Sequence, residues 1–464
     1  MCEVADFSLN KGTVFQKRTV FFMPEQAAEP PRSLGSMISL FYHLEIHMNF
    51  KYRALTLGCF AAMGLAGTAQ AVQLAGDLLE VYGNVYPQYQ TVTFGDSSAT
   101  GAAVSTLTGG KTGAQTNTFK AGAVSATKLN PVNSYIGFTG KKTIGGLTLG
   151  YDLQGVINID STASNPSFMS EPRDAFVWIS HDKFGTLQAG QQDTIYKSYG
   201  DKVRMLGVSS SNFVSTSNVV SNPTWSNKGT STSFNTRVNG QLLWTSPRIG
   251  GFEVGYSLRQ DPTKTATRNQ GLSSVGINWT DKTYYVGLAQ EVHDDYYAFS
   301  GAASTAAAGS VYNAATGLRS KDTGTRLSFG YRATGVRIGA DTSTLNYTET
   351  SAQANGFQSH KFSSYQITAE YDLNSQIAVA AQYASTGAGN CTLNGAIACS
   401  TVGLGGNLVG FGANYKLDKN FAVFALVAKG TANSGAVISL GSGAGKTAIG
   451  GTINAAAVGI QAKF

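Results

Sequence analysis

The chain has little charge and no long apolar run. Only 13% of its 464 residues are charged, against about 25% in soluble globular proteins, so an ordinary soluble enzyme is disfavoured. No apolar run reaches the roughly 18 residues of a membrane-spanning helix, which excludes a helical membrane protein. The 21 Tyr and 24 Phe exclude disorder. What remains is a glycine-rich β chain, long enough for about two or three soluble domains or one large barrel.

Catalytic and metal-binding groups are also scarce. After residue 71 the histidines are His181, His293 and His360, which lie on different predicted strands. A hydrolase needs a nucleophile, a base and an orienting group, and no Gly-x-Ser-x-Gly motif is present. The same scarcity disfavours a histidine-based metal site. We therefore predict a protein that is not an enzyme and has no cofactor.

Residues 48–71 have the order of a secretory signal peptide. A short basic start is followed by an apolar run at 54–67 and by a small-x-small site that ends at Ala71. The apolar run is too short to remain as a membrane anchor. We expect cleavage between Ala71 and Val72.

Residues 1–47 show no sustained helix or strand period. Export needs the signal peptide at the front of the chain, so we interpret these residues as an upstream extension from a mis-called start, with translation beginning at Met48. A lipoprotein signal modified at Cys59 is a competing interpretation, but Thr56 stands where such signals usually have Leu.

Two cysteines remain in the predicted mature chain, residues 72–464. Cys391 and Cys399 form an even pair in an exported protein, which predicts a disulfide. Its small ring would constrain the unfolded chain by roughly 2–3 kcal/mol. The formal net charge of the whole sequence is only +7, and no stretch is dense in Lys and Arg, so nucleic-acid binding is disfavoured.

The mature chain alternates between apolar and polar residues with a period of two. In one segment the apolar set is Phe252, Val254, Tyr256 and Leu258, and the polar set is Glu253, Gly255, Ser257 and Arg259. Successive side chains on a strand point to opposite faces, so each segment has one apolar and one polar face. The same alternation recurs at 274–279, 326–332, 365–372 and 409–416.

Short turns and long loops alternate between these strands. The predicted long loops are 92–131, 159–172, 193–235, 261–271, 294–322, 348–360, 388–406 and 430–452. Short turns at one end and long loops at the other are typical of an outer-membrane barrel. We predict an all-β fold, a transmembrane antiparallel β-barrel of about sixteen strands with short periplasmic turns and long extracellular loops.

Aromatic residues gather near the short turns and the C-terminus. They are Trp244, Phe252, Trp279, Tyr284, Tyr331, Tyr371, Tyr415, Phe421 and Phe464. In a barrel they would form one ring at the membrane interface. A soluble β-sandwich or propeller would bury them in a core instead, without placing them all at one end.

An ordered set of motifs resembles the general porins of Gram-negative bacteria. Residues 81–83 (Val-Tyr-Gly) open the first strand, residues 173–190 are similar to the fourth and fifth strands, and 246–252 to the turn before the seventh. Residues 457–464, ending in Phe464, are typical of a porin C-terminus. The resemblance covers nearly all of the mature chain and is closest to the β-proteobacterial trimeric type.

The resemblance implies a homotrimer in the outer membrane whose water-filled channels pass ions and small hydrophilic solutes by passive diffusion. It also implies that the barrel assembly machinery reads Phe464, and that the third long loop, 193–235, folds inward as a constriction loop. The candidate residues of that loop are Asp193, Lys197, Asp201, Lys202 and Arg204. The alternatives are a substrate-specific outer-membrane channel or a structural or adhesive barrel.

Alternation predicts which charged residues line the pore. The selectivity candidates are Arg237, Arg259, Arg326, Arg332, Arg337, Glu253, Glu370 and Lys416. Inward Arg outnumbers inward acid on the middle strands, so we predict a weak anion preference or near-neutrality. Arg237 is the leading candidate because it directly follows the predicted constriction loop.

The chain departs from the family at two places. Gln191 and Gln192 follow Gly190 where many relatives have Arg, and the Pro-Glu-Phe-Gly-Gly loop tip is absent. The usual arginine-against-carboxylate constriction therefore lacks its usual residues here.

The signal peptide makes a direct prediction. N-terminal sequencing of the exported protein should read Val72 first, because the small residues before it form the cleavage site. A mature protein that keeps Met1 would contradict both the cleavage site and the start at Met48.

Overall fold

The computed structural model describes residues 72–96, 125–159, 169–224, 234–262, 264, 269–296, 319–350, 357–393, 399–441 and 444–464. The predicted signal peptide, the extension before it and Cys59 lie outside these residues. The described residues belong to one compact unit, Gly67–Phe464. Among them, no helix is long and apolar enough to cross a membrane.

The described strands form one antiparallel sheet. They are β1 (Val72–Gln73), β2 (Glu80–Val85), β3 (Gln88–Phe94), β4 (Ser125–Asn130), β5 (Tyr135–Ile144), β6 (Leu147–Ile157), β7 (Met169–His181), β8 (Gly185–Asp193), β9 (Arg237–Thr245), β10 (Phe252–Arg259), β11 (Gly271–Thr280), β12 (Tyr284–Asp294), β13 (Arg319–Ala333), β14 (Val336–Thr350), β15 (Phe357–Asp372), β16 (Ile377–Thr386), β17 (Asn390–Leu393), β18 (Gly406–Lys416), β19 (Phe421–Ala432) and β20 (Thr452–Lys463).

Some of these segments are parts of one wall strand. Three wall strands are interrupted and give two segments each: β2 with β3, β4 with β5, and β16 with β17. The short β1 only adds to the side of β2. The wall therefore has 16 strands, which confirms the predicted fold class.

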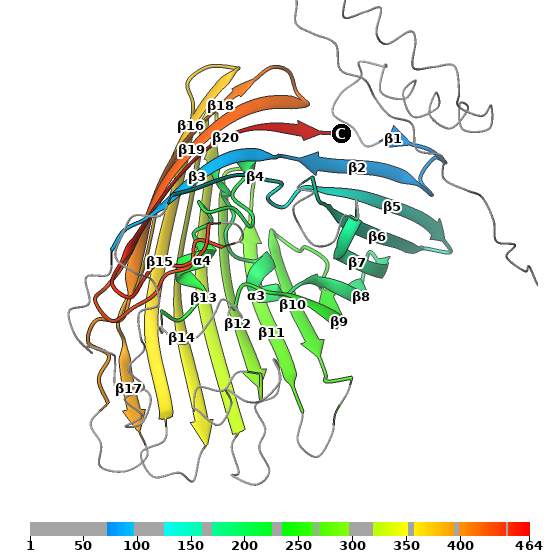
Figure 1. Ribbon diagram of the computed structural model, residues 1–464. Coiled ribbons are helices and arrows are strands. Elements are labelled where there is room, and N and C mark those ends of the chain that lie inside the picture. The colour runs from blue at the N-terminus through cyan, green and yellow to red at the C-terminus, as the bar shows by residue number, and fades with distance from the viewer. Residues whose placement is uncertain are drawn as a thin grey trace, which may run out of the picture. The chain divides into compact units, whose positions relative to one another are not determined.

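The sheet closes on itself between the two ends of the chain. β20 pairs with β3 from Ile453↔Phe94 to Gly459↔Gln88, and with β2 through Asn84↔Lys463. Figure 1 shows β20, in red, beside β2 and β3, in blue. Among the described residues, closure gives every wall strand a paired neighbour on each side, although the segments β4 and β17 pair on one side only. The described sheet therefore has no edge strand.

The apolar face of the wall is its outer face. On β10, Val254 and Tyr256 are 39% and 45% exposed, whereas Ser257, on the inner face, is fully buried. A soluble protein would bury the apolar set instead. The outer surface is therefore suited to hydrocarbon, which excludes the soluble sandwich or propeller.

Short turns join the strands at one end of the barrel. Between β5 and β6 the turn residues Gly145 and Gly146 both have positive φ, 59° and 82°, which glycine adopts without a Cβ clash and which suits a tight hairpin. Outer aromatic side chains gather near this end: Trp244, Phe252, Tyr284, Tyr371, Tyr415, Phe421 and Phe464 are all exposed.

At the other end the strands run further than the sequence predicted. β3 continues to Phe94, inside the predicted loop 92–131, and β13 begins at Arg319, inside the predicted loop 294–322. β13 and β14 stay paired from Ala333↔Val336 out to Arg319↔Thr350. The neighbouring strand supplies hydrogen bonds that local sequence does not reveal, so polar residues extend the sheet.

The described parts of two long connections fold inside the wall. The connection between β8 and β9, residues 194–236, is named the lumen loop and contains α3 (Ile195–Ser198), η2 (Met205–Gly207) and α4 (Ser217–Val220). Figure 1 shows α3 and α4 within the ring of strands. The connection between β19 and β20, residues 433–451, is named the last loop.

Candidate functional site

The lumen loop hydrogen-bonds to inner faces of strands far from its own. In order along the loop, its wall partners are Ser274 on β11, Tyr285 on β12, Asp341 on β14, Glu370 on β15, Gln382 on β16 and Ser364 on β15. It also meets β3, where Asn212 Nδ2 donates to Gln88 Oε1 at 2.8 Å. The loop thus reaches from β8 to the far side of the lumen.

Two wall carboxylates hold the backbone of this loop. Asp341 accepts from the Asp201 N–H (3.3 Å), and Glu370 accepts from the Leu206 N–H. Asp201 and Leu206 have positive φ values of 50° and 52°, a conformation that costs L residues roughly 1–2 kcal/mol. The two wall hydrogen bonds offset this strain and fix the path of the loop.

Arg326, predicted to line the pore, lies under the loop instead. Alternation places it on the inner face correctly, but it is only 2% exposed. Its guanidinium donates two hydrogen bonds to Asp341, at 3.2 and 3.0 Å. A Cβ at Gly200 would lie 2.0 Å from Arg326 Cζ, so glycine lets the loop pass directly over the guanidinium. Arg326 therefore supports the loop and is covered from the channel.

The two predicted pore-lining residues on β10, Glu253 and Arg259, also make local contacts. Glu253 accepts from the Tyr199 hydroxyl of the lumen loop (3.1 Å) and pairs with Arg248 (3.0 Å). Arg259 faces inward but is 7% exposed, with its guanidinium carbon 5.7 Å from the centre of the Tyr296 ring. Burial removes Arg259 from the water-lined surface that alternation predicted.

Arg332, Arg337 and Lys416 lie at the turn end of the inner wall. Arg337 donates to Glu370 (2.6 Å) and to Asp372 (3.0 Å), and Lys416 Nζ is 3.8 Å from Asp372. Arg332 is exposed next to the turn between β13 and β14. The charges of Arg337 and Lys416 are therefore partly compensated by carboxylates.

Arg237 joins the two ends of the lumen loop. Its guanidinium lies 2.6 Å from Asp174 on β7 and 3.1 Å from Asp193 at the end of β8. Lys197, one turn into the loop, is 3.0 Å from the same Asp193. The residue that sequence order favoured as a filter is thus matched by two carboxylates and closes the base of the loop.

Two hollows remain on either side of the lumen loop. The loop-side hollow, about 450 Å³, lies between the lumen loop and the last loop, and its charged lining is Lys197, Arg204, Lys446 and Asp201. The turn-side hollow, about 390 Å³, has Lys202, Arg248, Asp174, Asp193 and Glu253. The loop-side hollow therefore has a positive excess that the turn-side hollow lacks.

Among the cationic residues of the loop-side hollow, Arg204 is weakly paired and keeps its positive charge at every physiological pH. Its side chain is 41% exposed, and its ion-pair contact with Asp201 is long, at 3.9 Å. Burial lowers the pKa of the Lys197 ammonium, an effect that the neighbouring Asp193 opposes. Burial also raises the pKa of Asp201, against the effect of Arg204. Arginine, by contrast, stays charged throughout the physiological range.

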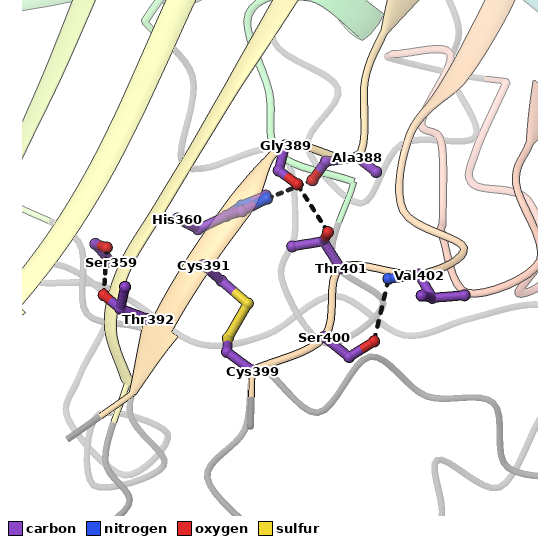
Figure 2. Close-up of a disulfide and its surroundings, with 10 residues drawn as sticks. All are labelled: Ser359, His360, Ala388, Gly389, Cys391, Thr392, Cys399, Ser400, Thr401 and Val402. Carbon is purple, nitrogen blue, oxygen red and sulfur yellow. Dashed lines mark hydrogen bonds between the residues drawn. A yellow bond between two sulfur atoms is a disulfide. The ribbon is translucent and has the colours of Figure 1, made fainter. Parts of the chain in front are cut away.

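A disulfide joins Cys391 of β17 to Cys399. Figure 2 shows it beside His360, whose Nε2 lies 2.7 Å from the Ala388 carbonyl oxygen. The same connection ends at Gly405, whose N–H donates to Thr224 Oγ1 of the lumen loop (2.8 Å). The disulfide-bearing connection thus contacts the far end of the lumen loop.

The sequence analysis missed the infolding of the last loop. Its Ile438 and Leu440 are 2% and 0% exposed and share a buried cluster with Val219 and Val220 of α4. A run of aliphatic residues inside a glycine-rich loop was the available signal.

A polar network on β6 was also missed. Asp152 accepts from the Tyr82 hydroxyl (2.7 Å), and Gln154 donates to the same hydroxyl (2.8 Å). The alternation along β6 places Asp152 and Gln154 on the inner face and could have found them. In the part of the chain that the structure describes, no group of His, Cys, Asp or Glu is arranged to hold a metal ion.

Comparison with known proteins agrees with this architecture. The model of the family described as Gram-negative porin matches residues 54–435. No curated protein matches the sequence. Among solved structures, the anion-selective porin from Comamonas acidovorans is similar, at 16% identity and a TM-score of 0.60, over 83% of this chain and 99% of that chain.

Other outer-membrane proteins are similar at comparable levels. OmpT of Vibrio cholerae, folded in vitro, is 14% identical with a TM-score of 0.52, over 84% of this chain and 99% of that chain. OmpF of Salmonella typhi is 14% identical with a TM-score of 0.50, over 85% of this chain and 100% of that chain. At these identities the likeness concerns the fold.

The wall carboxylates predict how the lumen loop can be loosened. Glu370→Ala removes the acceptor of the Leu206 N–H, so the loop should fluctuate and single-channel current noise should rise. Asp372→Ala is the matched control, because it removes a carboxylate from the same Arg337, whereas Asp372 makes no hydrogen bond to the described residues of the loop. Planar-bilayer recordings measure both, and equal noise in the two variants would contradict the anchoring role.

Proposed function

The chain belongs to the Gram-negative porin family, and from this premise we propose that its lumen loop narrows the channel and gives it a weak preference for anions. Family and fold establish the coarser function: a multi-pass outer-membrane β-barrel whose water-filled channel passes ions and small hydrophilic solutes by passive diffusion. They point to a channel rather than to an enzyme.

The placement of the lumen loop is the observation that supports the constriction. A sixteen-stranded barrel is too wide for its wall side chains to fill, so a segment inside the wall is what reduces the passage. This loop contacts β3 on one side and β11 to β16 on the other. Solutes must pass through the space that it leaves.

The preference for anions is supported by unequal compensation of charge. Arg237, Arg326 and Arg337 are paired with carboxylates at 2.6–3.1 Å. Arg204 has its closest carboxylate at 3.9 Å, and Lys446 is exposed at the loop-side hollow. Net positive charge facing a water-filled passage enriches anions. The similar structure from Comamonas acidovorans is itself described as anion-selective.

Arg204→Gln tests the source of the selectivity. A unit charge about 8 Å from an ion in water changes the energy of that ion by about 0.5 kcal/mol, with opposite sign for anions and cations. The anion-to-cation permeability ratio should therefore fall roughly five-fold at low salt. The measurement is the reversal potential in a salt gradient. Arg332→Gln, next to the short turn between β13 and β14, is the control and should shift the reversal potential less. A larger shift for Arg332→Gln would place the filter elsewhere.

We also propose that Phe464 is an assembly signal and that the assembled form is a homotrimer. Phe464 is 37% exposed at the turn end, and its backbone pairs with Gly83 on β2 at 2.9 and 3.2 Å. The Phe464 ring is therefore accessible to a binding partner, while the Phe464 backbone takes part in closing the barrel. A trimer form is described for the similar OmpT of Vibrio cholerae.

Phe464→Ala separates recognition from closure, because it removes the ring and keeps the backbone pairs with Gly83. We expect several-fold less folded trimer in outer membranes, measured on native gels, but unchanged folding of purified chain into lipid vesicles. Normal assembly in cells would remove the signal role. An equal loss of folding in vesicles would mean that the ring stabilises the barrel and is not a signal. A folded monomer in wild-type membranes would contradict the trimer.

A further inference from the structure

The loop-side hollow has the size and the walls of a small-molecule site. Its volume of about 450 Å³ lies within the range of ligand pockets, about 300–1,000 Å³. One wall is the lumen loop and the other is the last loop. A solute that enters from the loop end meets this hollow before the proposed constriction.

The described lining residues are polar or charged, apart from two glycines. Besides its four charged residues the hollow presents five serines and three asparagines, together with Gly441 and Gly445. No aromatic or aliphatic side chain is among the described lining residues, so apolar ligands and sugars that stack on rings are poorly matched. The serine hydroxyls and asparagine amides can both donate to and accept from ligand hydroxyls.

The last loop holds the cationic wall in place. Ile438 and Leu440 are buried, and the Ile438 N–H donates to Thr447 Oγ1 (3.0 Å). The backbones of Ser439 and Lys446 form an antiparallel β-bridge across this hairpin. These contacts place Lys446, whose side chain is exposed, at the hollow without requiring the loop to fold on a ligand.

From this lining we propose that the loop-side hollow is a binding subsite for small hydroxylated carboxylates, such as sugar acids. Lys446 and Arg204 supply charge-assisted hydrogen bonds to the carboxylate, and the serine and asparagine groups match the hydroxyls. The proposal rests on the channel function and on the anion preference, and it adds a chemical class of solute that neither one specifies.

The test is block of single-channel current by gluconate, added to each side of a planar bilayer in turn. Gluconate should block from the loop side at concentrations where acetate, which has charge without hydroxyls, and glucose, which has hydroxyls without charge, do not. Lys446→Gln should raise the half-blocking concentration about ten-fold, the order expected for loss of one charge-assisted hydrogen bond. Lys446→Arg should keep the block.

Lys419→Gln is the matched control, because Lys419 is an exposed lysine in the short turn between β18 and β19, at the opposite end. Equal block by acetate and gluconate, or by glucose and gluconate, would overturn the proposal, as would unchanged block in Lys446→Gln. If current steps occur but gluconate does not block them, the subsite proposal is wrong and the channel function still holds. Absence of any current steps would instead contradict the channel function.

Discussion

The need to pair every backbone amide away from water governs the whole structure. Hydrocarbon offers no hydrogen-bond partner, so a sheet that faces it must have no open edge. The pairing of β20 with β2 and β3 meets that need by joining the two ends of the chain. Once the wall is closed, the period of two sends apolar side chains to the lipid and polar ones inward.

Closure at this size leaves an interior that wall side chains cannot fill, and two loops occupy part of it. The wall meets the lumen loop with carboxylates, each of which serves a backbone N–H of the loop and an arginine of the wall. Asp341 does so for Asp201 and Arg326. A carboxylate can accept several hydrogen bonds at once, so one residue both fixes the loop and neutralises a buried arginine.

This arrangement separates arginines that support the structure from arginines that face solutes. Alternation in the sequence predicts that Arg237 and Arg326 face inward as free cations. In the structure both form ion pairs with carboxylates at the lumen loop. Arg204, by contrast, has only a long contact to a carboxylate, 3.9 Å from Asp201. A count of inward charges in the sequence therefore does not give the number of uncompensated ones.

The barrel, its strand number, the inward and outward faces, the short turns and the cysteine pair could all be predicted from the sequence, because these depend on local alternation and spacing. Which inner residues meet water could not be predicted, because it depends on how the loops fold over the wall. Arg326 and Arg259 alternate like pore-lining residues but are covered, and the pairing of Arg237 with Asp174 joins residues 63 positions apart. Whether a loop folds over an inner side chain depends on contacts across the lumen, and no local pattern encodes them.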